Sequence, residues 1–245
     1  MPVEQLSGQR VVVIGGSSGI GFAVAQRAIE AGAEVTVGSS DGDRVDAAIG
    51  RLGQQASGAV VDVRDETSLA GFFGGVGRFD HLAFTAGDWG AFRAPRAMTE
   101  LDLDRAGDVF RVRFWGAVAA VKHALGGLAE SGSITLTNGV VAHRPRKQAA
   151  LSTAMAGAIE HLTQALAVDL APLRVNAVCP GLVLTDVWND IPEDRREEQL
   201  RRMTASQPLP RAGLPAEVAE AYLYLMTGTY STGQVLVVDG GRTLV

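Results

Sequence analysis

A glycine-rich segment near the N-terminus has the residue types and spacing of a phosphate site. Gly15, Gly19 and Gly21 follow directly after the apolar residues 11–14. This order predicts a strand, a tight turn and the start of a helix, whose first amide groups and dipole attract a phosphate. Gly15 permits the turn, Gly19 lets a pyrophosphate approach the backbone, and Gly21 lets the helix pack on the strand. The segment therefore predicts a dinucleotide-binding site.

Side chains that exchange protons are scarce in comparison. The three tyrosines are Tyr222, Tyr224 and Tyr230, all near the C-terminus, and the two lysines are Lys122 and Lys147. Lys147 is predicted to be a solvated surface residue or to lie at the mouth of a site. Of the four histidines, His143 is the best placed for chemistry. The sequence thus predicts a ligand more firmly than a reaction.

The elements that would position these residues alternate along the chain. Apolar runs predict strands at residues 10–14, 34–38, 58–61, 81–84, 133–137, 174–178 and 234–237. Their continuous apolar character is typical of parallel strands buried on both faces. Between them, helical spacing is clearest at residues 19–31, 99–128 and 149–170. We expect an α/β fold, a doubly wound, Rossmann-type parallel sheet of seven strands with helices on both faces.

The bulk composition supports one domain. The 245 residues are 47% hydrophobic and 20% charged, so we expect a single globular domain over residues 1–245, with a substrate lid around residues 186–210. A net charge of −5 gives no reason to expect nucleic acid or a membrane surface as a partner. One cysteine, a polar N-terminus without a secretory signal and no long apolar run favour a cytoplasmic protein.

Small residues are dense in the predicted helix at 149–170. Ala150, Ala154, Gly157, Ala158 and Ala165 recur at helical spacing. They indicate either packing of this helix on the sheet or a close interface between subunits.

Several motifs in order carry a family resemblance. They are the glycine turn, Asp62 with Val63, Ala86 with Gly87, the segment from Arg174 to Thr185, and Val238 to Gly241. With these motifs the chain resembles the short-chain dehydrogenase/reductase family from end to end. The resemblance implies a nicotinamide cofactor, a small-molecule substrate, and a homotetramer or homodimer. It implies that the cofactor is bound by Gly15, Ser17, Ser18, Gly19, Ile20, Gly21, Ser39, Ser40, Asp62, Val63, Ala86, Gly87, Pro180, Gly181, Val183 and Thr185.

The end of the second predicted strand bears on the choice of cofactor. Members of this family often place an acidic residue there for the ribose hydroxyls of NAD, whereas this chain has Gly38 and Ser39. No carboxylate would repel a 2′-phosphate, and Ser39, Ser40 or Arg44 could bind one. We therefore expect NADP(H) in preference to NAD(H).

The family's catalytic Asn, Ser, Tyr and Lys are replaced when the chain is matched to its motifs. Arg113 falls at the Asn position, Gly139 at the Ser position beside Asn138, Ser152 at the Tyr position and Ala156 at the Lys position. The candidate catalytic residues are Arg113, Asn138 and Ser152, and no metal site is expected. Arg113 either stabilises negative charge on a substrate or anchors its carboxylate, or it is a structural residue bound to carbonyl groups.

Three functions remain in competition. The first is an NAD(P)-dependent oxidoreductase that transfers hydride to a small carbonyl or imine compound with atypical proton delivery. The second is a nucleotide-binding module without turnover, and the third is a cyclase, dehydratase or isomerase that reuses the pocket. Trp89 and Phe92, just after Asp88, are predicted to wall the substrate pocket together with lid residues Trp188, Ile191, Leu200 and Met203.

Overall fold

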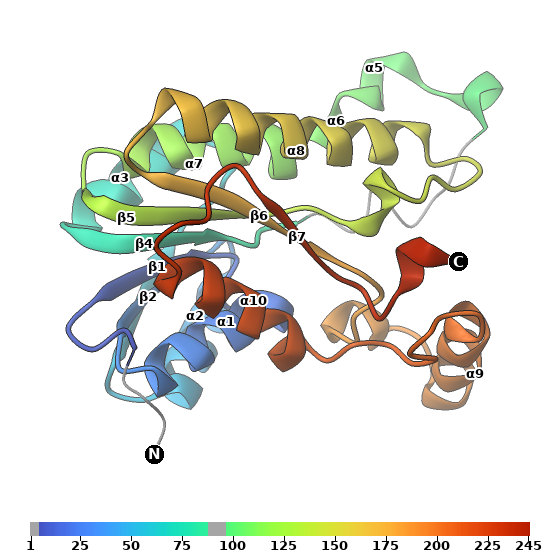
Figure 1. Ribbon diagram of the computed structural model, residues 1–245, viewed down its shortest axis with the longest axis horizontal. Helices are drawn as coiled ribbons and strands as arrows, with labels where there is room; N and C mark the ends of the chain where they lie inside the picture. Colours follow the sequence, from blue (N-terminus) through green and yellow to red (C-terminus); the bar gives the residue numbers. More distant parts are fainter. Residues whose placement is uncertain (1–4, 88–96) are drawn as a thin grey trace.

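Seven parallel strands form one sheet in this computed structural model, which describes residues 5–87 and 97–245 (Figure 1). The strands are β1 (Arg10–Ile14), β2 (Glu34–Ser39), β3 (Ala56–Val60), β4 (Phe79–Phe84), β5 (Leu128–Thr137), β6 (Arg174–Pro180) and β7 (Val235–Val238). Their order is β3-β2-β1-β4-β5-β6-β7, so the direction of winding reverses between β1 and β4. The predicted doubly wound fold is confirmed, and a crevice is expected where the winding reverses.

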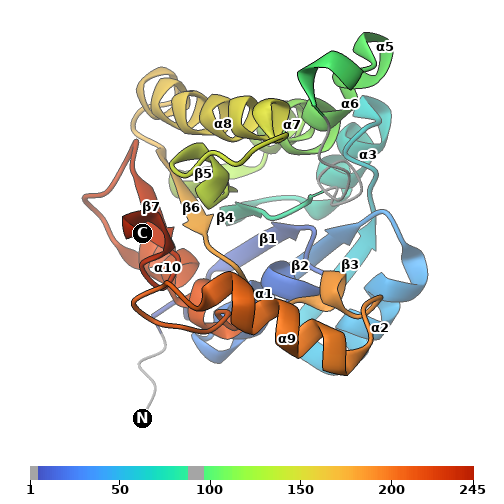
Figure 2. The same ribbon diagram turned by 90° about the vertical axis from the view of Figure 1, so that its right-hand side faces the viewer.

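Helices cover both faces of the sheet (Figure 2). One face carries α1 (Gly19–Glu30), α2 (Gly42–Leu52) and α10 (Pro215–Thr227), and the other carries α3 (Glu66–Val76), α7 (Gly116–Ala124) and α8 (Ala150–Asp169). The helix α9 (Glu193–Thr204) lies beyond the carboxyl ends of the strands (Figure 1). Within the described part of the chain, no helix has the length and apolar character needed to cross a membrane.

Strand β1 shows why its sequence is continuously apolar. Val11 and Val13 pack in the core beneath α1 and α10, whereas Val12 and Ile14 pack in the core beneath α3, α7 and α8. Successive side chains point to opposite faces, so both faces need apolar residues. The prediction of burial on both faces is wrong for β3, where Val60 is 56% exposed, because β3 is an edge strand.

The predicted helix at residues 99–128 is broken into short pieces. They are η1 (Met98–Glu100), α5 (Leu103–Ala106), α6 (Asp108–Phe110), the π-helical turn η2 (Arg111–Trp115) and α7. Asp102 caps α5 by accepting a hydrogen bond from the amide of Asp104, and Gly116 begins α7 against Val63. A continuous helix was therefore the wrong prediction, and the interruption lies at the candidate residue Arg113.

The small residues of α8 lie away from the sheet. Ser152, Met155, Ala156, Ile159 and Thr163 form the buried side of this helix. Residues 150, 154, 157, 158 and 165 are exposed or half-buried. The helix does pack on the sheet, as one of the two predicted alternatives states, but through its buried side rather than through these small residues.

The predicted lid contains the short helix η4 (Asp186–Trp188) as well as α9. The indole of Trp188 donates a hydrogen bond to the carbonyl of Val183 at 3.0 Å and ties η4 to the end of β6. Ion pairs on α9 join Glu193 to Arg196 and Glu198 to Arg201, so this charged stretch is a solvated helix face.

His81 is buried in β4 among polar partners. Its Nδ1 lies 2.8 Å from Ser133 Oγ and its Nε2 lies 2.6 Å from Gln9 Oε1. Because the Gln9 oxygen only accepts, Nε2 carries the hydrogen and Nδ1 accepts from Ser133. Burial, with the nearby Arg174 charge, lowers the pKa of His81 to about 4, so the folded protein holds this ring neutral.

This arrangement predicts a loss of stability in acid. Between pH 6.5 and about 4, His81 is protonated in the unfolded chain but stays neutral in the folded chain. The contribution of the neutral His81 to the free energy of unfolding is complete above pH 6.5. It is lost as the pH falls toward 4, by about 3 kcal/mol in total. The free energy of unfolding of His81→Gln should fall less steeply over this range than that of the natural protein. His161→Gln, at an exposed position of α8, is the control for the exchange of a histidine for glutamine. Parallel curves for His81→Gln and the natural protein would contradict the assignment.

Candidate functional site

A cleft of about 1480 Å³ opens at the carboxyl edge of the sheet. Pockets for single drug-sized ligands are typically about 300–1,000 Å³, so this cleft has room for a dinucleotide and a substrate together. All the residues predicted to bind the cofactor line it, namely Gly15, Ser17, Ser18, Gly19, Ile20, Gly21, Ser39, Ser40, Asp62, Val63, Ala86, Gly87, Pro180, Gly181, Val183 and Thr185. Arg113 and Asn138 line the same cleft.

The glycine turn packs backbone against backbone. Gly15 has a φ of +87°, and a Cβ placed there would lie 2.5 Å from the amide nitrogen of Ala86 at the end of β4. A Cβ at Gly21 would overlap the carbonyl oxygen of Gly15 and Thr85 Oγ1. Only glycine fits at these two positions, because the first turn of α1 approaches the ends of β1 and β4 so closely.

The N-terminus of α1 is open toward the cleft. Its capping residue Ser18 makes no side-chain hydrogen bond to the helix, and its first turn carries no acidic residue. The first amide groups of a helix need acceptors, and the helix dipole favours an anion there. Since Ser18 and the first turn of α1 line the cleft, they fit the pyrophosphate of a dinucleotide cofactor. The nicotinamide of such a cofactor would supply or accept a hydride when bound.

Residues after β2 and β3, on the other side of β1 from β4, line the part of the cleft where the adenosine of the cofactor is expected. Ser17 Oγ donates a hydrogen bond to Ser39 Oγ at 2.9 Å, which links the glycine turn to the end of β2. The carboxylate of Asp62 accepts hydrogen bonds from Arg64, and this guanidinium keeps the pKa of Asp62 below its ordinary value. With Arg44 also lining the cleft, this end carries little net negative charge.

Arg113 lies on the π-helical turn η2 and faces the cleft from the side opposite the glycine turn. Its guanidinium packs on Gly87, where a Cβ would lie 2.9 Å from one terminal nitrogen. The same positive charge counteracts the raised pKa of Tyr222, so the guanidinium lies within electrostatic reach of that phenol. A π turn accommodates one residue more than an α turn and is frequent at functional sites.

Tyr222 does not take the place of the missing catalytic tyrosine. Its hydroxyl lies 2.6 Å from Thr137 Oγ1, and Thr137 in turn donates to the carbonyl of Phe84 at 2.6 Å. The phenol therefore donates to Thr137. Burial raises the pKa of Tyr222 well above its ordinary value, which makes the fully buried phenol a poor proton donor.

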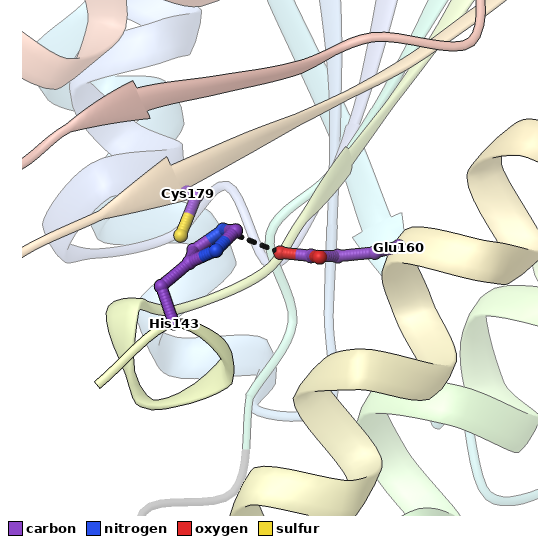
Figure 3. A group of neighbouring side chains, drawn as sticks. All are labelled: His143, Glu160 and Cys179. Carbon is purple, nitrogen blue, oxygen red and sulfur yellow. Dashed lines mark ion pairs between the residues drawn. The ribbon is translucent and has the colours of Figure 1, made fainter. Parts of the chain in front are cut away.

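Glu160 binds two polar groups of the segment after β5, and Figure 3 shows one of them, His143, together with Cys179. Its Oε1 accepts a hydrogen bond from Asn138 Nδ2 at 2.6 Å and pairs with His143 Nε2 at 2.8 Å. The thiol of Cys179 completes a group of ligand atoms within 4.8 Å of one another, a grouping that could hold a metal ion and that the sequence analysis missed. Burial raises the pKa of Cys179 to about 12. Glu160 is already bound to Asn138 and His143, which both belong to the segment after β5. We therefore regard the group as an anchor for the loop after β5.

The remaining candidates are divided between the cleft lining and other parts of the structure. Ser152 is buried on the first turn of α8 and is not among the residues that line the cleft within the described ranges. Lys122 pairs with Glu66 at 2.5 Å on the far side of α7, and Lys147 is exposed. The predicted wall residues Trp89 and Phe92, with Asp88 and Gly90, lie outside the described residues. Of the lid candidates, Trp188, Ile191 and Met203 line the cleft, whereas Leu200 does not.

Three arginines of the site were not predicted. Arg144 and Arg146 follow the short helix η3 (Val140–Ala142), Arg242 begins η5 (Arg242–Leu244), and all three line the cleft. Their local sequences carry no motif. Only the fold brings the loop after β5 and the segment after β7 together.

Replacement of Gly21 by alanine tests the close packing. Gly21→Ala should lower the free energy of unfolding by roughly 1–3 kcal/mol, because the methyl group would displace the turn. It should also raise the Kd for NADPH at least about tenfold, measured by quenching of tryptophan fluorescence. A matched control is Gly71→Ala in α3, where a Cβ meets nothing within 4 Å. That control should leave NADPH binding unchanged and stabilise the helix by about 0.5–1 kcal/mol. Unaltered NADPH binding by Gly21→Ala would refute the close-packing argument.

Comparison with known proteins agrees with this geometry. A family model described as enoyl-(acyl carrier protein) reductase matches residues 14–243. The short-chain dehydrogenase/reductase ucsE of an Acremonium species is 36% identical, over 98% of this chain and 97% of its own. The solved structure of the MalC reductase/Diels-Alderase from Malbranchea aurantiaca superposes with a TM-score of 0.91 at 34% identity, over 99% of both chains. A small-chain dehydrogenase solved in complex with NADPH superposes with a TM-score of 0.81 at 33% identity, over 97% of this chain and 99% of its own. The chain belongs to the short-chain dehydrogenase/reductase family, as an oxidoreductase that binds a nicotinamide cofactor.

Proposed function

We propose that the protein is an NADP(H)-dependent reductase of small carbonyl or imine compounds in which Arg113 replaces the usual proton-donating tyrosine as the group that activates the substrate. The observation that carries the proposal is the position of Arg113 in the cleft, against Gly87 at the carboxyl end of β4. Relatives named as reductases and dehydrogenases support this function over a binding module or a non-redox enzyme.

The charge of Arg113 suits the electron flow of such a reaction. As a hydride reaches the carbon of a C=O bond, negative charge develops on the oxygen. A guanidinium within hydrogen-bond distance stabilises that charge. Arginine keeps its own proton, so the product oxygen takes its proton from water. A cationic iminium carbon needs no proton at all when it accepts hydride.

Asn138 is proposed to support this centre. It is 2% exposed, lines the cleft and is fixed by the bond between its Nδ2 and Glu160. That bond sets the orientation of the amide, because the carboxylate accepts only from the NH₂ group. We assign Ser152 no direct contact with the substrate, since it lies outside the cleft lining.

The preference for NADP(H) is proposed from the groups at the end of β2. Ser39 and Ser40 line the cleft there and offer hydroxyl donors, and Arg44 lies at the start of α2. The nearby carboxylate of Asp62 is already paired with Arg64. These groups favour a 2′-phosphate over an unmodified ribose.

Replacement of Arg113 tests the proposed role directly. Arg113→Gln should lower kcat by about 10²–10³-fold with carbonyl substrates, while the Kd for NADPH changes little. The assay is substrate-dependent loss of NADPH absorbance across a panel of carbonyl and cyclic imine compounds. Arg111→Gln on the same π turn is the control, since Arg111 is exposed and pairs with Asp108 at 3.6 Å. Full activity of Arg113→Gln would overturn the proposal, as would an equal loss in Arg111→Gln.

A new carboxylate at the end of β2 tests the cofactor preference. Ser39→Asp should raise the Kd for NADPH at least about tenfold through repulsion of the 2′-phosphate, and should leave the Kd for NADH nearly unchanged. Isothermal titration calorimetry measures both values. Ser57→Asp, on the exposed strand β3 outside the cleft lining, introduces the same charge as a control. A natural protein that binds NADH more tightly than NADPH would contradict the assignment.

A further inference from the structure

A group of three positively charged side chains lies at the substrate end of the cleft. Arg144, Arg146 and Arg242 all line it, and we call them the arginine triad. They come from the loop after β5 and from the segment after β7, which lie side by side (Figure 1). The sheet order places them on the half opposite β2 and the proposed 2′-phosphate site.

Two members of the triad, Arg144 and Arg242, are held in place by neutral groups. One terminal nitrogen of Arg144 donates to the backbone carbonyl of Arg242 at 3.0 Å. Arg242 in turn donates to the carbonyl of Met203 at 2.8 Å and to Gln207 Oε1 at 2.7 Å. These contacts fix the guanidinium groups of Arg144 and Arg242 but do not compensate their charge.

Nearby carboxylates offset the charge of the triad only in part. Across residues 5–87 and 97–245, no carboxylate forms an ion pair with any of the three arginines. Asp239 lies near Arg242, but its two oxygens accept hydrogen bonds from the backbone amides of Gly241 and Thr243 at 2.8 and 2.7 Å. The pKa of Arg242 is lowered first by burial and then by the charges of Arg144 and Arg146, which repel its own charge, and the smaller effect of Asp239 raises it.

The loop that carries two of these arginines is anchored rather than loose. Glu160 binds both Asn138 and His143, at the two ends of the segment that leads to Arg144. Figure 3 shows the pair with His143. The amide of Arg144 donates to the carbonyl of Val140 at 2.8 Å. The fold therefore holds like charges close together at the edge of a cleft, in a protein whose net charge is −5.

From this geometry we infer that the arginine triad is an anion-binding subsite and that the natural substrate is a carboxylate-bearing carbonyl or imine compound. An anionic group would accept charge-assisted hydrogen bonds and remove the mutual repulsion of the three arginines. In this arrangement the triad binds the anionic group of the substrate, and Arg113 stabilises charge at the reacting C=O or C=N bond. The inference rests on the proposed function only for the identity of the reacting group.

The test compares two probes that differ only in charge. The full chain, saturated with NADPH, is titrated calorimetrically with 4-acetylbenzoate and with the uncharged 4-acetylbenzamide. The acid should bind about tenfold or more tightly than the amide, and added sodium chloride should weaken only the acid. In Arg146→Gln the Kd for the acid should rise about tenfold, while the Kd values for the amide and for NADPH stay unchanged. Arg146 is the preferred position because its side chain is exposed, so the change should not disturb folding.

A matched surface variant and the alternative outcomes make the test decisive. Arg105→Gln removes the same charge from α5, outside the cleft lining, and should change none of these Kd values. Equal affinity for acid and amide, or failure of both to bind, would overturn the inference. A weaker Kd for NADPH in Arg146→Gln would also overturn it, because the triad would then serve the cofactor. Selective acid binding without NADPH oxidation would instead retain the subsite and reject the proposed reductase activity.

Discussion

The contact between backbones at the ends of β1 and β4 is the constraint on which the cleft depends. Gly15 lies against the amide of Ala86, and Gly21 lies against the carbonyl of Gly15. Because no side chain intervenes, α1 begins directly at the edge of the sheet and its first amide groups open onto the cleft. The apolar cores on the two faces hold this edge rigidly, so the site inherits its geometry from the packing of β1 and β4.

Much of the fold and the cofactor end of the site could be predicted from the sequence because their signals are local. The apolar run of β1 and the spacing of Gly15, Gly19 and Gly21 are read within a dozen neighbouring residues. The exposure of β3 could not be read in this way, because an edge position follows from the order of all seven strands. The π turn η2 could not be predicted either, because the one extra residue it accommodates carries no sequence signal of its own.

The substrate end was harder to predict because its residues meet only through the fold. Glu160 sits in the middle of α8, yet it holds Asn138 and His143 from the loop that follows β5. Arg144 and Arg242 are nearly a hundred positions apart and are joined by one hydrogen bond. No spacing rule connects such residues. Arg113, by contrast, was found because the family resemblance fixed its position on a helix.

The π turn at residues 111–115 also has a consequence for how this site can change by insertion and deletion. One extra residue is accommodated there without lengthening α7, whose apolar side packs on α3 and the sheet. Each residue of an α-helix turns the chain by about 100°. Loss of a single residue from the turn would therefore rotate everything before it relative to α7 and swing the guanidinium of Arg113 off Gly87. The same backbone defect would allow relatives to present a different side chain to the cleft while their helical core stays unaltered.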